Sequence, residues 1–241
     1  MFNHSINMPS KNSLKLYSDD SYYHIYNRGV EKRLIFQDQQ DYRVFLSYLK
    51  EYLSPKDEEE LSNKLLDPLI SAKERDKVLK ALRLNNFFGE INLISYCLMP
   101  NHFHLLIKQN SAVSMDKFMN SLGTRYTIYF NRKYKRVGSL YQDVYKAVMV
   151  ESDPQLLYLT TYIHRNPIKS ASQGDVWEAI TSQPSSYPEY LGQRKTKWIR
   201  PEEILSFFSK TDPKNSYQNF VEGTKDLSSL IEPIQDLMLD F

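Results

Sequence analysis

Short hydrophobic runs at four places in the chain predict β-strands. Residues 21–30 (SYYHIYNRGV), 91–98 (INLISYCL) and 102–108 (HFHLLIK) are rich in β-branched and aromatic side chains, which is typical of strands. A turn at residues 99–101 joins the second run to the third, so these two runs are expected to form a hairpin. A fourth strand is expected within residues 139–150.

Apolar residues at intervals of three and four predict helices between these strands. Residues 41–53 show this spacing, and Asp38 is placed to cap that helix. Residues 113–133 show the same spacing. A third helix is expected to open at Asp153, a capping residue followed by a first-turn proline. It is expected to end near Pro167, because proline cannot donate a backbone hydrogen bond.

The order strand, helix, strand, strand, helix, strand, helix predicts an α+β fold. We expect a ferredoxin-like antiparallel sheet with helices on one face. Residues from about 55 to 85 are charge-rich with leucines at helical spacing, and we interpret them as a helical insertion packed against the sheet. The main domain is expected to span residues 1–193. Residues 194–241 are expected to form a helical C-terminal extension with a packing or regulatory role.

Composition limits the class of protein without identifying it. The chain of 241 residues contains no apolar run of about 18 residues, so no membrane partner is expected. Its polar beginning lacks the features of a secretory signal, and a cytoplasmic location is therefore expected. The single cysteine, Cys97, lies in an apolar run and is interpreted as a small buried side chain. A lone cysteine excludes an intramolecular disulfide and fits a reducing compartment.

The overall charge of +2 does not indicate a polyanionic partner, but its distribution does. Residues 125–146 contain six basic residues against Asp143 alone, interleaved with aromatic residues. Basic groups neutralise phosphates and aromatic faces stack on unpaired bases, so this segment is a candidate surface for single-stranded nucleic acid. The alternative is a solvated helix face whose aromatic residues belong to the core.

Two pairs of residues carry candidate chemistry. His102 and His104 are two apart on a predicted strand, so both imidazoles project from the same face and are natural metal ligands. Tyr162 and Asn166 are four apart on a predicted helix and share a face, which places a phenol beside an amide. Each pair alone is a weak signal, because core histidines and structural tyrosines are common.

Together, these motifs resemble those of the REP-associated tyrosine transposases, which belong to the single-tyrosine HUH transposases of small insertion sequences. The resemblance covers roughly residues 20 to 193. The stretches that carry it are YHIYNRG (23–29), MPNHFHLLI (99–107), RYTIYFNRKYKRVGSLYQ (125–142), SLYQDVYKAVMVE (139–151), YIHRNPIKS (162–170) and SSYPEYLG (185–192).

This resemblance implies a fold, a metal and a reaction. The fold would be an HUH palm in which His102, His104 and Asn166 hold Mg²⁺ or Mn²⁺. Ligand chemistry alone would favour Zn²⁺ or Mn²⁺, because imidazole is an unusual ligand for Mg²⁺. Tyr162 would attack a phosphate of single-stranded or hairpin DNA and form a 5′-phosphotyrosine. The enzyme would act as a monomer or a homodimer.

Candidate DNA contacts come from the basic segment and from the motifs around the two pairs. They are Arg28, Arg125, Arg132, Lys133, Arg136, Lys146, His164 and Arg165. The resemblance leads us to expect a basic residue just before Tyr145, where the chain has Asp143-Val144, and this departure removes one expected phosphate contact. His24, on the first strand, is either a satisfied strand histidine or a contact to DNA or the active site.

Three alternative functions remain open from the sequence. The protein could bind single-stranded DNA or RNA hairpins without cutting them, since the basic segment would serve that role equally well. It could be a metal-dependent phosphodiesterase that uses activated water in place of tyrosine. It could also be a structural α+β protein with core histidines. The full set of two histidines, tyrosine and asparagine favours the transposase, because a binding protein has no need for it.

Overall fold

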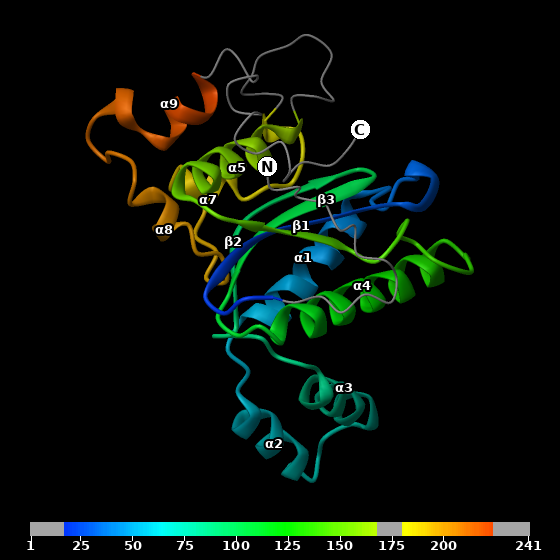
Figure 1. The fold of residues 1–241 in the computed structure, drawn as a ribbon. Helices are drawn as coiled ribbons and strands as arrows, with labels where there is room; N and C mark the ends of the chain where they lie inside the picture. The colour runs from blue at the N-terminus through cyan, green and yellow to red at the C-terminus, as the bar shows by residue number, and fades with distance from the viewer. Residues whose placement is uncertain (1–16, 168–179, 224–241) are drawn as a thin grey trace.

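Four antiparallel strands form a single sheet at the centre of the molecule (Figure 1). The computed structural model describes residues 17–167 and 180–223. The strands are β1 (Ser21–Arg28), β2 (Ile91–Met99), β3 (His102–Gln109) and β4 (Lys146–Val150), and their order across the sheet is β2-β3-β1-β4. This order, with one crossover between β1 and β2 and another between β3 and β4, is the ferredoxin-like topology and confirms the predicted fold.

Helices α1 (Gln39–Leu53) and α4 (Ser114–Lys133) cover one face of the sheet (Figure 1). As predicted, Asp38 caps α1, and its carboxylate accepts the backbone N–H groups of residues 40 and 41. The apolar side chains of both helices pack against every second side chain of the strands, on the face of the sheet that these helices cover. This first core includes Ile25, Phe45, Leu49, Phe103, Leu105, Phe118, Leu122 and Tyr126.

A second layer covers the opposite face. It contains α5 (Asp153–Arg165), α7 (Tyr187–Tyr190), α8 (Glu202–Leu205) and α9 (Tyr217–Glu222), and its core includes Leu106, Leu159, Ile163, Tyr190 and Val221. Helix α5 begins one residue earlier than predicted. Ser152 provides the cap, accepting the N–H of Gln155, so Asp153 becomes the first residue of the helix.

Strand alternation decides which side chains face which layer. The odd positions of β1 and β3, such as Ile25 and Phe103, enter the first core beneath α1 and α4. The even positions, which include His24, His102 and His104, therefore face α5. Strand β4 is shorter than predicted, because residues 139–145 form a loop that joins the sheet through an isolated bridge between Gly29 and Tyr141.

The predicted insertion is a helical hairpin, but its predicted packing against the sheet is wrong. Helices α2 (Glu58–Leu66) and α3 (Ala72–Arg83) pack mainly on each other and extend away from the sheet (Figure 1). Two leucines of this segment, Leu66 at the end of α2 and Leu69 in the loop that follows, are exposed. The base of the hairpin is closed by Lys56, whose ammonium donates to the carbonyls of residues 82 and 84.

The described part of the C-terminal segment packs into both cores, although the predicted boundary at residue 193 remains a prediction. Ile199 is buried in the first core and bridges to Leu93 of β2, while Ile204 and Val221 are buried in the second. The predicted extension is helical only in part, since α8 ends at Leu205 and α9 at Glu222. Residues from 224 onward lie outside the described residues.

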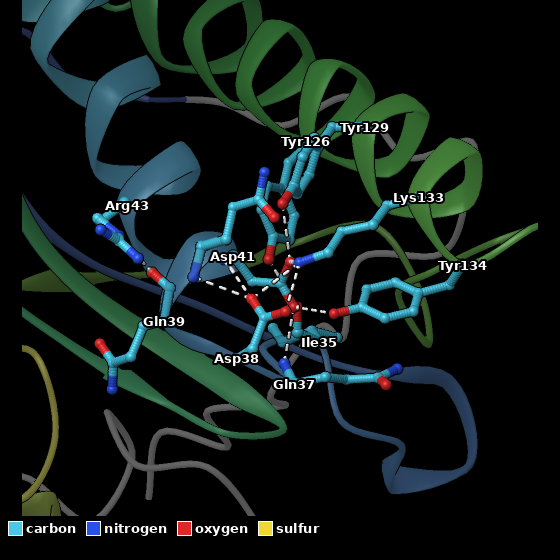
Figure 2. Close-up of polar contacts among 11 residues, drawn as sticks. Ile35, Gln37, Asp38, Gln39, Asp41, Arg43, Tyr126, Tyr129, Lys133 and Tyr134 are labelled. Atoms are coloured by element: carbon cyan, nitrogen blue, oxygen red, sulfur yellow. Dashed lines mark hydrogen bonds and ion pairs between the residues drawn. The ribbon is translucent and has the colours of Figure 1, made fainter.

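A buried carboxylate joins the start of α1 to the end of α4 (Figure 2). Asp41 accepts hydrogen bonds from Gln37 N (2.8 Å), Tyr129 Oη (2.9 Å), Lys133 Nζ (2.7 Å) and Tyr134 Oη (2.8 Å). Burial alone would raise the pKa of Asp41, but these hydrogen bonds hold it below its usual value. The cluster therefore links the beginning of α1 to the end of α4.

Replacing Asp41 with alanine is expected to lower the free energy of unfolding by about 2 kcal/mol, because Lys133 and two phenols lose their shared acceptor. Urea denaturation at pH 7 measures this loss. Asp38→Asn is the matched control, since Asp38 is exposed, also pairs with Lys133 (2.7 Å), and asparagine keeps the helix cap. A much smaller loss is expected for the control, and equal losses would contradict the role given to the buried carboxylate.

Candidate metal and nucleophile site

The two residue pairs singled out by the sequence meet between β3 and α5. His102 and His104 project from the even face of β3, and both are buried. Tyr162 and Asn166 lie at the C-terminal end of α5, which crosses that face, and both are also buried. The strand repeat of two residues places both histidines on one face of β3, and the helix repeat of 3.6 residues places Tyr162 and Asn166 on one face of α5. These four polar side chains meet where the two faces pack together.

The amide of Asn166 lies between the two imidazoles. Its Oδ1 is 3.2 Å from Nε2 of His102, and its Nδ2 is 3.2 Å from Nε2 of His104. Neighbouring ligands of a small divalent cation with bonds of about 2.1 Å are separated by roughly 3 Å in octahedral geometry. The Nε2 of His102 and the Oδ1 of Asn166 therefore have the spacing of two ligands of one cation, and the Nε2 of His104 lies at the other side of the same amide.

The hydrogen bonds around His102 support this interpretation. Asn101 donates its Nδ2 to the carbonyl of Lys32 (3.4 Å), which turns its Oδ1 toward Nδ1 of His102 at 2.6 Å. His102 can then donate its Nδ1–H to Asn101, and in that tautomer its Nε2 lone pair faces the Oδ1 of Asn166. An imidazole nitrogen and an amide oxygen 3.2 Å apart can both bind one cation that lies to the side of the line joining them, so these residues fit a metal ion.

Among the described residues, no three His, Cys, Asp or Glu side chains form a metal-binding group. A metal at this site would therefore need the amide of Asn166 as its third protein ligand. Water or a phosphate oxygen would complete the coordination, which is the open arrangement of catalytic metal sites.

Tyr162 lies edge-on against the histidines. Its ring centroid is 5.5 Å from that of His104, and the two planes are nearly perpendicular, at 82°. Burial raises the pKa of the Tyr162 phenol well above its usual value, while a hydrogen bond with Asn166 acts in the opposite direction. The phenol is therefore protonated at neutral pH.

His24, whose role the sequence left open, is fully buried beside His104. Its Nε2 is 2.9 Å from Nδ1 of His104, and the two rings are stacked with centroids 5.1 Å apart. The signal in the sequence was the alternation of residues 22, 24 and 26, which places His24 on the face that α5 covers. Asn101, which the sequence analysis did not single out, directly precedes His102.

Only two of the predicted DNA contacts lie beside this site. Arg28 is at the end of β1 opposite His102, and its guanidinium donates to Oε1 of Gln142 (3.1 and 3.2 Å). Lys146 begins β4 opposite Tyr26, and its ammonium is 5.9 Å from the centroid of that ring. Both positive charges lie on the same side of the histidine strand β3, Arg28 on the adjacent strand β1 and Lys146 on the edge strand β4.

The other basic candidates, on or just after α4, lie on the far side of the sheet. Arg125 pairs with Glu51 (2.7 Å) and stacks 3.8 Å over the ring of Tyr48, while Lys133 belongs to the Asp41 cluster. Arg136 donates to Asn131 (3.0 Å), and Arg132 is exposed. The basic segment is therefore divided, because α4 and β4 cover different regions of the molecule and most of the aromatic residues of α4 belong to the first core.

His164 and Arg165, also predicted as DNA contacts, are buried on the side of α5 that faces the C-terminal segment. His164 bonds to Tyr217 Oη (2.7 Å) and Ser186 Oγ (2.8 Å), and Arg165 donates to the carbonyl of Val221. Both side chains are at most 7% exposed, so the described structure leaves little surface for a phosphate. These two side chains are buried because α9 packs over this side of α5, a contact between segments that are far apart in the sequence.

The burial of His164 predicts a pH-dependent stability. Desolvation lowers the pKa of His164 to about 3, so it stays neutral in the folded protein while the unfolded chain gains a proton below about pH 6.5. Its stabilisation is complete above pH 6.5 and is lost as the pH falls, by about 1.4 kcal/mol per pH unit. Urea denaturation at pH 7.5, 6 and 5 should show a shallower decline for His164→Gln than for the unmodified protein. Parallel declines would contradict this.

Comparison with known proteins agrees with this site. Residues 67–166 match the sequence profile of the family described as "Transposase IS200 like", a range that contains both histidines, Tyr162 and Asn166. This similarity confirms the resemblance to IS200-like transposases for residues 67–166. It supports a transposase-like function in DNA processing.

One similar solved structure is described as a REP-associated tyrosine transposase bound to a REP hairpin. The two chains share 10% sequence identity with a TM-score of 0.46, over 86% of this chain and 97% of the other. No curated protein matches the sequence. None of the helices in the described ranges is long and apolar enough to cross a membrane.

Proposed function

We propose that this protein is a metal-dependent endonuclease and strand transferase that acts on single-stranded or hairpin DNA through a 5′-phosphotyrosine. The observation that carries the proposal is the convergence of His102, His104 and Asn166 beside Tyr162, within the region that matches the transposase family. A phenol beside two imidazoles and an amide has the parts needed for attack on a phosphodiester.

The proposed step balances without a further reactant. The Tyr162 oxygen attacks the scissile phosphorus, the bond from phosphorus to the 3′ oxygen breaks, and the phenol proton ends on the released 3′-hydroxyl. Bound Mg²⁺ or Mn²⁺ would polarise the phosphate and stabilise its developing charge. The covalent link conserves the free energy of the phosphodiester, so attack by a 3′-hydroxyl rejoins DNA without ATP.

The rest of the site supports binding and orientation. Asn166 touches both imidazoles and interacts with the phenol, so it relates the nucleophile to the ligand set. Arg28 and Lys146 would contact phosphates of a DNA strand that runs over the β1–β4 side of the site, where both positive charges lie. Tyr162 lies beside the histidines of its own chain, and a monomer would therefore contain a complete site.

Labelled DNA tests the reaction and its polarity together. The full-length protein is incubated with a pool of hairpin oligonucleotides that carry randomised single-stranded flanks, with Mn²⁺, Mg²⁺ or EDTA. A 5′-phosphotyrosine predicts that 3′-labelled DNA becomes attached to the protein, whereas 5′-labelled DNA is released with a free 3′-hydroxyl.

Each alternative gives a different result. Attachment of the 5′-labelled strand would contradict the proposed polarity. Cleavage without any covalent adduct would identify a phosphodiesterase that uses water. Binding of the hairpins with neither cleavage nor adduct would identify a non-catalytic binding protein.

A further inference from the structure

A third histidine, His24, contacts the proposed ligand His104 through the ring nitrogen that faces away from Asn166. His24 lies on β1 opposite Leu106, diagonal to His104 on the neighbouring strand, and both histidines are fully buried. Diagonal neighbours on one face of an antiparallel pair are within reach of large side chains. Nε2 of His24 comes to 2.9 Å from Nδ1 of His104, which is hydrogen-bonding distance.

The contacts of His104 indicate which of its ring nitrogens carries the proton. Asn166 presents its Nδ2 to Nε2 of His104 at 3.2 Å, so Nε2 is the acceptor on that ring. The ring proton then belongs on Nδ1, and that N–H donates to Nε2 of His24. In this tautomer, the lone pair of His104 points at the site where Asn166 and the Nε2 of His102 converge.

We propose that His24 is a positioning residue, which accepts the Nδ1–H of His104 and thereby holds the His104 lone pair toward the metal. This inference rests on the proposed function, since it assigns a role within the same site. Groups that bind the second nitrogen of a ligating histidine set its tautomer and ring orientation, and their loss typically costs about 10- to 100-fold in metal affinity. Asn101 contacts the Nδ1 of His102 in the same way, so each of the two proposed histidine ligands has a hydrogen-bond partner on its second ring nitrogen.

Two substitutions separate hydrogen bonding from packing. His24→Gln keeps an acceptor oxygen near the position of Nε2, whereas His24→Leu fills the space without an acceptor. We expect His24→Leu to weaken Mn²⁺ binding to the full-length protein by about 10- to 100-fold, and His24→Gln to retain most of the affinity. Isothermal titration with Mn²⁺ alone gives both values, and thermal unfolding followed by circular dichroism verifies that each variant is folded.

A second measurement does not depend on metal. The chain has five histidines, so ¹⁵N spectra of histidine-labelled protein can resolve the His104 ring, assigned by its loss in His104→Ala. We expect the Nδ1–H tautomer in the unmodified protein and in His24→Gln, and a mixture of tautomers in His24→Leu. If His24→Leu does not fold, the tautomer in the unmodified protein and the Mn²⁺ affinity of His24→Gln still decide the question.

The outcomes are distinct from those that test the proposed function. Unchanged Mn²⁺ affinity in His24→Leu, equal losses in both variants, or an Nε2–H tautomer of His104 in the unmodified protein would overturn the role of His24. Absence of Mn²⁺ binding by the unmodified protein would overturn both this role and the metal site. Intact Mn²⁺ binding with the expected pattern, but no DNA adduct, would support His24 and contradict the nuclease proposal.

Discussion

Tyr162→Phe is expected to abolish the covalent DNA adduct, reducing its rate of formation by roughly a thousandfold or more. The substitution removes the attacking oxygen and leaves the ring in place against His104. Stability should change by at most about 1 kcal/mol, because only one hydroxyl and its contact with Asn166 are lost. Hairpin binding should stay close to that of the unmodified protein, since the phenol is not one of the proposed phosphate contacts.

Denaturing gels with 3′-labelled hairpin DNA measure the adduct, and a binding titration in EDTA measures affinity. Tyr158→Phe is the matched control, because Tyr158 lies one turn earlier on α5 and stacks on Phe220, with ring centroids 5.8 Å apart, outside the site. This control should form the adduct at the normal rate. An adduct of undiminished yield in Tyr162→Phe would assign the nucleophile to another residue.

His104→Ala is expected to remove Mn²⁺ binding and to reduce cleavage by roughly 100-fold or more, since it deletes one of three proposed protein ligands. His102→Ala should have a similar effect on cleavage. EDTA should reproduce the loss in the unmodified protein, and added Mn²⁺ should restore it there but not in His104→Ala.

Titration with Mn²⁺ and the same adduct assay provide the two readouts. Because His104 is fully buried and bonded to His24, the variant needs circular dichroism to show that the loss is not caused by unfolding. Full cleavage by a folded His104→Ala in excess chelator would rule out metal dependence at this site.

The sequence alone determined the parts of the site that depend on local periodicity. A strand repeats every two residues, so His102 and His104 had to share a face whatever the strand packs against. A helix repeats every 3.6 residues, so Tyr162 and Asn166 had to lie on one side of theirs. The order of strand and helix signals likewise determined the ferredoxin-like sheet, because few connections join such elements.

Only the tertiary structure decided what those faces meet. Helix α5 covers the even face of β1 and β3, which turned His24 from an ambiguous strand histidine into a neighbour of His104. The C-terminal segment covers the other side of α5, which buried His164 and Arg165 although their sequence positions beside Tyr162 suggested contact with DNA.

The tertiary structure also decided where the basic segment and the helical insertion lie. Arg125 and Lys133 are close in sequence to Lys146, yet they pair with acids on α1 beneath the opposite face of the sheet. Helices α2 and α3 pack mainly against each other, not against the sheet. Periodicity is fixed by backbone geometry within a few residues, whereas the partner of each face depends on burial and hydrogen bonding between segments far apart in the chain, and only the folded structure contains that information.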